Sequence, residues 1–186
     1  MVETLTEVGI KVNLVDADKL GHLCYDLNLK NCVDDIEKEF GKNCIYTTEE
    51  GKKNVNRKVL GPIVFANPEK LKWLSNLVWP LIKELIEKEI ENSKKSNFEF
   101  VIIESATLIE SGLFQIFDEV WCFSVSKQEA IKRLMKRNNL SEQESMNRIN
   151  SQMSNEEREK FCTFVIQTDE TIENVKEKIK KVLGIQ

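Results

Sequence analysis

Four strand-length apolar segments alternate with helical patterns along this chain, and this alternation constrains the fold more than any other feature. The segments span residues 11–16, 98–105, 119–126 and 161–168. The second contains four consecutive apolar residues, Phe100 to Ile103, and such a run is typical of a strand buried on both faces of a parallel sheet. Strands separated by helices favour an α/β layered fold with a mainly parallel sheet.

The longest helical pattern runs through residues 67–95. Asn67 is a suitable N-cap and Pro68 suits the first helical position. Pro80 lies inside the apolar stripe, and we expect it to kink this helix or to split it in two. Residues 32–41 place apolar side chains on one helical face and stop at Gly41, whereas residues 43–56 are polar and turn-rich.

Composition narrows the class of protein. A chain of 186 residues with net charge −4 fits one soluble domain and gives no sign of nucleic-acid binding. No apolar run approaches the roughly 20 residues that span a bilayer, and the N-terminus does not resemble a secretory signal. The five cysteines form no C-x-x-C pair, and with a single histidine a zinc site is excluded. Reduced thiols indicate a cytoplasmic protein.

Carboxylates follow the first two strands. Asp16 and Asp18 come after the first strand, Glu104 ends the second, and Glu110 lies in the next turn. Ligands of such sheets bind at the carboxyl ends of the strands. Carboxylates there suit magnesium, and one beside an acceptor hydroxyl can take its proton. The structural alternative is that Asp16 or Asp18 only caps the helix that follows.

Cationic residues crowd the segment between the last two strands. They are Arg133, Lys136, Arg137, Arg148 and Arg158. Two helices with arginines on facing sides would form a phosphate clamp, because the guanidinium donates to phosphate oxygens in a planar fork. The alternative is a solvated helical hairpin, in which the interleaved glutamates form salt bridges with these cations. His22, the only histidine, is either a structural or surface residue or part of the site.

Several motifs in this order resemble dephospho-CoA kinase. The stretches are "DADKLGH", "NRKVLGPIVFANPEKLKWL", "WPLIKEL", "IESATLIESGL", "DEVWCFSV" and "RNNLSEQESMNRINSQMS". They extend over nearly the whole chain. The "NRKVLG" and "WP" stretches look closer to the kinase domain of the animal bifunctional CoA synthase than to bacterial enzymes. The "ATLIE" segment keeps the apolar frame and Glu110 of the bacterial "PLLFE" but lacks its proline.

The resemblance implies a three-layer P-loop NTPase-type parallel sheet over residues 1–186, with a helical lid at about 127–160. It implies transfer of the ATP γ-phosphate to the ribose 3′-hydroxyl of dephospho-CoA, the last step of coenzyme A biosynthesis, with Mg²⁺. The implied partners are ATP and dephospho-CoA, without nucleic acid or a membrane span, and fusion to or association with an adenylyltransferase domain stays open. The implied residues are Asp18 and Arg137 (catalytic), Asp16, His22, Arg57 and Glu110 (substrate-binding), Arg133, Arg137 and Arg148 (ATP phosphates), and Glu104 (metal).

One family feature is missing from the sequence. The family begins with a strand and the loop G-x-x-x-x-G-K-[ST], whose amides hold the nucleotide phosphates, and no such motif occurs in the 186 residues. We therefore expect the first strand and the P-loop to be absent and phosphotransfer to be impaired. The sequence is either an incomplete gene model or a real short form. The other functions left open are a non-catalytic CoA-precursor-binding or scaffolding relative and another nucleoside kinase of this fold.

Overall fold

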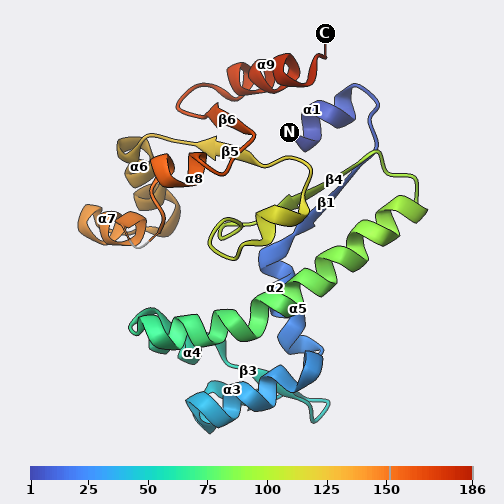
Figure 1. Cartoon of the computed structure of the whole chain (residues 1–186). Coiled ribbons are helices and arrows are strands. Elements are labelled where there is room, and N and C mark those ends of the chain that lie inside the picture. Colours follow the sequence, from blue (N-terminus) through green and yellow to red (C-terminus); the bar gives the residue numbers. More distant parts are fainter. Residues whose placement is uncertain (151, 186) are drawn as a thin grey trace. The chain divides into compact units, whose positions relative to one another are not determined.

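The computed structural model describes residues 1–150 and 152–185, and these form an α/β protein (Figure 1). The chain divides into two compact units. The first unit consists of residues 10–106, and the second consists of residues 1–9 together with residues 107–186. No helix in the described ranges is long and apolar enough to cross a membrane.

The first unit is built on a pair of parallel strands and a long helix. Its elements are β1 (Val12–Asp16), α2 (Ala17–Asp26), η1 (Leu29–Asn31), α3 (Cys32–Phe40), η2 (Lys42–Cys44), β2 (Ile45–Thr47), β3 (Lys53–Val55), α4 (Arg57–Phe65), α5 (Pro68–Lys95) and β4 (Phe100–Glu104). Strands β1 and β4 pair in parallel (Figure 1). Their register places Asp16 opposite Glu104. This register places both carboxylates at the same end of the pair.

Two expectations for this unit are corrected. β4 is not buried on both faces, because Phe100 is 46% exposed and Val101, Ile102 and Ile103 are only half-buried. Among the described residues β4 pairs only with β1, and a strand at a sheet edge is not enclosed as a central strand would be. The segment 43–56 is not only turn: it contains the antiparallel hairpin β2–β3.

Pro80 does not split the long helix, since α5 runs without interruption from Pro68 to Lys95. A proline removes one backbone hydrogen bond, here the bond to the carbonyl of Asn76. Both Pro80 and Asn76 are exposed, so water can hydrate that carbonyl. The buried residues Val78 and Leu81, on the opposite side of the helix, pack into the core and keep the helix continuous.

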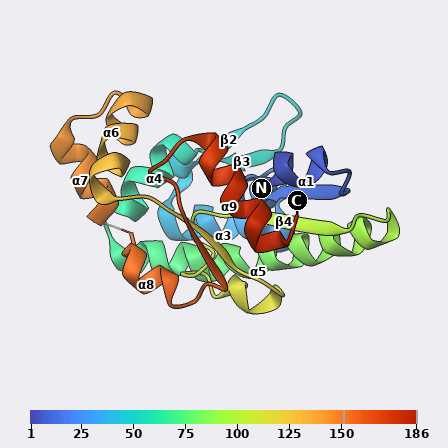
Figure 2. The same ribbon diagram turned by 90° about the horizontal axis from the view of Figure 1, so that it is seen from above.

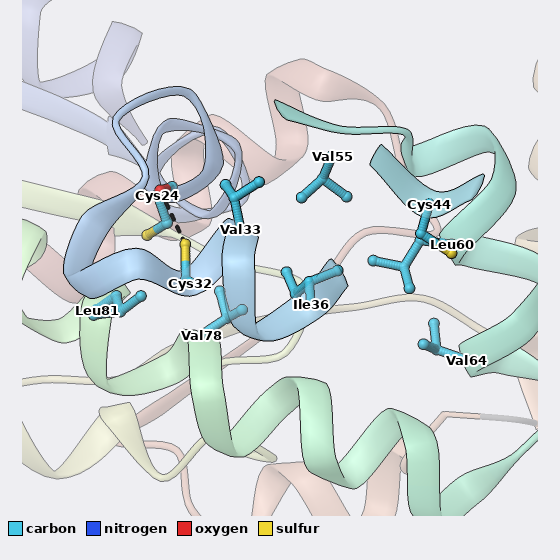
Figure 3. Packing of buried hydrophobic residues seen from close by; sticks show 10 residues of the cluster. All are labelled: Cys24, Cys32, Val33, Ile36, Cys44, Val55, Leu60, Val64, Val78 and Leu81. Atoms are coloured by element: carbon cyan, nitrogen blue, oxygen red, sulfur yellow. Dashed lines mark hydrogen bonds between the residues drawn. The ribbon is translucent and has the colours of Figure 1, made fainter. Parts of the chain in front are cut away.

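The core of the first unit lies between α3, α4, α5 and the hairpin rather than on the β1–β4 pair. Figure 3 shows its buried members, which are Cys24, Cys32, Val33, Ile36, Cys44, Val55, Leu60, Val64, Val78 and Leu81. The Cys32 thiol donates to the Cys24 carbonyl over 3.2 Å. Gly41 follows α3 at φ +90°, a conformation that side-chain-bearing residues rarely adopt, so the predicted helix stop is confirmed.

The second unit contains a second pair of parallel strands and the remaining helices. Its elements are α1 (Val2–Glu7), η3 (Leu113–Ile116), β5 (Trp121–Ser124), α6 (Lys127–Asn138), α7 (Glu142–Asn150), α8 (Asn155–Glu159), β6 (Phe164–Gln167) and α9 (Ile172–Leu183). Strands β5 and β6 are parallel, with Trp121 opposite Phe164. Helices α6 and α7 pack against each other, as Figure 2 shows in orange.

Capping side chains fix where these two helices begin. Ser126 accepts from the backbone N–H of Glu129 at the start of α6. Ahead of α7, Ser141 accepts from the N–H of Glu144, and the Glu144 carboxylate accepts from the N–H of Ser141 over 2.8 Å. Such reciprocal bonds satisfy backbone donors that a helix cannot pair internally. The α6–α7 segment is where the lid is predicted, and its role as a lid stays a prediction.

Candidate functional site

At the corner between β1 and α2, the two aspartates differ in their hydrogen bonds. Asp16 is the N-cap of α2 and accepts from the N–H of Lys19 over 3.0 Å. The Lys19 ammonium lies 3.1 Å from the same carboxylate. The pKa of Asp16 is lowered, first by the backbone bond from Lys19 and then by the Lys19 side chain. The capping alternative therefore holds for Asp16.

Asp18, unlike Asp16, has a carboxylate that no other described residue binds. It lies in the first turn of α2 and is exposed, and its carboxylate forms no hydrogen bond or ion pair within residues 1–150 and 152–185. A carboxylate without a protein partner, at the carboxyl end of a parallel strand, is available to a bound molecule. Of the two aspartates, only Asp18 can accept a proton without losing a structural hydrogen bond.

Glu104 faces Asp16 across the strand pair. It is exposed, and its side chain has no partner among the described residues. The described chain contains no cluster of three or more His, Cys, Asp or Glu side chains arranged for a metal ion. Magnesium is usually held by one or two carboxylates together with water and substrate phosphates. Glu104, beside the capping Asp16, fits such a partial donor set and does not form an all-protein cage.

His22 and Arg57 meet beside Asp18. His22 lies one turn after Asp18 on α2, and residues four apart share a helical face. The first residue of α4, Arg57, contacts His22 through its guanidinium Nη1 and the ring Nε2. A guanidinium can only donate, so in this pair the ring nitrogen is the acceptor. A second link, from Asn54 to Asp26 over 2.7 Å, ties the end of α2 to β3.

The structure brings together Asp16, Asp18, His22, Arg57 and Glu104 in the first unit. The other predicted residues lie in the second unit. Arg133 on α6 pairs with Glu129 over 3.1 Å and donates to the Thr168 carbonyl over 2.7 Å. These contacts anchor α6 to the end of β6, so the salt-bridged alternative describes Arg133.

The other two predicted lid arginines lie on exposed surface. Arg137, in the last turn of α6, donates through Nε to the Asn138 side chain over 2.9 Å. Arg148 lies in the last turn of α7 and is exposed. The terminal nitrogens of Arg137 have no partner among the described residues, which leaves them available to an anion.

Glu110 has a partner that the sequence did not single out. The Arg158 guanidinium on α8 lies 3.8 Å from Glu110 Oε1 and donates to the Met153 carbonyl over 3.3 Å. Glu110 Oε2 is buried without a hydrogen-bond partner in the described structure. From the sequence, Arg158 is only one of several cations between the last two strands. No local spacing could have revealed this contact, because the two residues are far apart in sequence.

Comparison with known proteins identifies the family. The family model described as dephospho-CoA kinase matches residues 1–174. The dephospho-CoA kinase of Dehalococcoides mccartyi is 34% identical over 173 residues, which cover 92% of this chain and 83% of the relative. That of Carboxydothermus hydrogenoformans is 33% identical over 186 residues, covering 96% and 84%.

Solved structures with a similar fold support the same family. A dephospho-CoA kinase from Campylobacter jejuni is 28% identical, with a TM-score of 0.66 over 98% of this chain and 88% of that one. A crystal structure from Thermus thermophilus, 24% identical, shares the fold with a TM-score of 0.73, again over 98% and 88%. The fold class predicted from the alternating strands and helices is confirmed. The chain belongs to the dephospho-CoA kinase family.

Proposed function

We propose that this protein binds dephospho-CoA and acts on its ribose 3′-hydroxyl, with ATP as the phosphoryl donor, in the last step of coenzyme A biosynthesis. Family membership supports the reaction class. The observation that carries the acceptor assignment is the juxtaposition of an unpaired carboxylate, Asp18, with the His22–Arg57 contact in the first unit. A carboxylate positioned beside a hydroxyl orients it and takes its proton as the phosphoryl group arrives.

The remaining residues have supporting roles in this proposal. Arg57 binds a phosphate group of the acceptor. The acceptor is also bound or positioned by Asp16, His22 and Glu110. Glu104 holds magnesium through water, and the ion, when bound, neutralises phosphate charge. The guanidinium groups of the α6–α7 hairpin balance charge on the ATP phosphates, a task for which the planar fork is suited.

Of the hairpin arginines, Arg137 and Arg148 have this task, and Arg137 touches the transferred phosphoryl group. Because Arg133 is engaged with Glu129 and Thr168, we propose that its part is to fix α6 in place. A cytoplasmic location is also proposed, supported by five cysteines that are all free thiols.

Phosphotransfer by the 186-residue chain is expected to be weak. Its sequence contains no G-x-x-x-x-G-K-S/T, and in P-loop enzymes the amides and the lysine of that loop hold the β- and γ-phosphates. The acceptor-side residues are present without it. A module that binds the CoA precursor without catalysing transfer is the second candidate function.

Calorimetric titration of the 186-residue chain with dephospho-CoA and with ATP, together with a phosphotransfer assay, tests both functions. We expect dephospho-CoA to bind and ATP to bind far more weakly than it binds to kinases that have the loop. Measurable transfer to dephospho-CoA identifies the enzyme, and binding without transfer identifies the module. Ordinary kinase-like ATP affinity contradicts the expected impairment. Preference for adenosine or shikimate over dephospho-CoA would instead identify another kinase of this fold.

A further inference from the structure

One face of α4 carries an unusual sequence of side chains. Arg57, Gly61 and Phe65 follow one another at intervals of four residues, so they lie along one side of the helix. A Cβ at Gly61 would meet only Cε2 of Phe65, at 3.9 Å, within the described structure. The phenyl ring therefore lies beside the bare glycine, and the surface over Gly61 is otherwise open.

The phenyl ring itself is turned to solvent. Phe65 is 79% exposed, more than any other large hydrophobic side chain of the described residues. A lone exposed hydrophobic residue is ordinary and needs no explanation. Here, however, the ring lies at one end of a strip on α4 whose other end is the Arg57 cation. No side chain projects between the two ends, because the residue there is Gly61.

The charged end of the strip is not neutralised by the protein. Arg57 is exposed and forms no ion pair with a carboxylate in the described parts of the chain. Its Nη1 faces His22, which leaves the other donors of the fork available. In a chain with net charge −4, this unpaired guanidinium is complementary to an anion and suits phosphate oxygens in particular.

We propose that the Arg57–Gly61–Phe65 strip binds the arm of the acceptor that lies beyond its ribose. Arg57 holds the diphosphate, the bare surface at Gly61 lets the chain pass, and the Phe65 ring packs against the branched dimethyl group of the pantetheine arm. The inference rests on the proposed function, because it extends the site of the same acceptor. It assigns Phe65 as a specificity-determining residue.

The order of groups supports this assignment. On α2, Asp18 lies one helical turn from His22, and His22 contacts Arg57 at the start of α4. Phe65 follows Arg57 two turns later on α4, which is about 12 Å of helix rise. Along dephospho-CoA, the ribose hydroxyl, the diphosphate and the dimethyl group follow in the same order. Adenine branches from the ribose in another direction, so this order places the aliphatic group on Phe65.

Three ligands separate the parts of the arm. Dephospho-CoA carries all groups, 4′-phosphopantetheine lacks the adenosine, and ADP lacks the pantetheine. Titration of the Phe65→Ala chain should show affinities for dephospho-CoA and 4′-phosphopantetheine reduced about tenfold, the loss expected when two methyl groups return to water. Affinity for ADP should not change. Arg57→Gln should weaken all three ligands, because each carries phosphate.

Gly61→Gln provides a variant that does not threaten folding. Glutamine is a better helix former than glycine, so the thermal unfolding midpoint should not fall. Its side chain covers the open surface, and affinity for dephospho-CoA should decrease. Lys58→Gln, an exposed cation on another side of α4, and Tyr46→Ala, an exposed aromatic side chain on β2, are matched controls that should bind like the parent.

The outcomes separate this inference from the proposed function. Parent-like affinity of both Phe65→Ala and Gly61→Gln for dephospho-CoA overturns the strip alone. If Phe65→Ala loses affinity for dephospho-CoA and ADP but keeps its affinity for 4′-phosphopantetheine, the Phe65 ring binds adenine. That outcome also overturns the assignment. Failure of the parent chain to bind dephospho-CoA overturns the proposed function, and the strip with it.

Discussion

At the scale of single residues, two aspartates that look alike in sequence have different environments. Asp16 caps α2 and is held by Lys19, so its carboxylate contributes to the start of the helix. Asp18 is exposed, with no side-chain partner among the described residues. A group that helix geometry does not require is available for chemistry, and this difference is why we assign the proton transfer to Asp18.

Asp18→Asn tests this role in a version of the chain supplied with a P-loop. Because asparagine cannot accept the hydroxyl proton, we expect kcat to fall by a factor of about 100 to 10,000. Nucleotide affinity, measured by titration, should stay nearly unchanged. Asp35→Asn, at an exposed position in the first turn of α3, is the control and should keep parent-like turnover. Unchanged turnover in Asp18→Asn would refute the role.

At the scale of elements, the first unit is stabilised by helices packed on helices. Helix α3 buries Val33 and Ile36 completely against residues of α4 and α5 (Figure 3). The β1–β4 pair contributes less buried surface, since Leu14 and Phe100 are each nearly half exposed. The strand pair mainly positions the carboxylates, while the helical core holds α2 and α4, which carry His22 and Arg57.

Ile36→Ala should therefore destabilise the first unit strongly. Removing a fully buried isoleucine side chain costs about 2–5 kcal/mol through lost transfer energy and the cavity left behind. Lys38→Ala, at an exposed position of the same helix, should change the free energy of unfolding by less than about 0.5 kcal/mol. Urea denaturation of the two variants measures the difference, and similar midpoints would show that α3 is not part of the stabilising core.

At the scale of the whole molecule, both units bury thiols that resist ionisation. Burial raises the pKa of Cys24 to about 12 and of Cys32 to about 11 in the first unit. In the second unit burial likewise raises the pKa of Cys122 to about 11. A buried thiolate loses hydration, so these side chains stay neutral in the folded protein at physiological pH.

Stability should consequently fall at alkaline pH. The folded-state thiol pKa values lie above the ordinary value of 9.0, so the unfolded chain loses these protons first. The stability that the neutral thiols contribute is complete below pH 9 and is lost as pH rises toward 11–12. Urea midpoints should be constant from pH 7 to 8.5 and decrease above pH 9. Replacing Cys24 and Cys32 by alanine should reduce that decrease, and an equal decrease without them would exclude thiol ionisation as its cause.

Much of the fold could be predicted because its signals are local. The N-cap at Asn67 and the stop at Gly41 act within one helical turn. The continuity of α5 through Pro80 and the exposure of β4 could not be predicted. Each depends on which side of an element is covered by distant parts of the chain, and periodicity carries no information on that covering.

The sequence by itself determined the alternation of strands and helices, the carboxylates at the strand ends, and the family that these motifs resemble. Only the tertiary structure decided that His22 contacts Arg57, that Arg133 is held by Thr168, and that Glu110 lies beside Arg158. Local patterns specify elements because backbone hydrogen bonds and side-chain periodicity act over a few residues. The availability of a charged group depends on contacts between residues far apart in sequence, and these exist only in the folded chain.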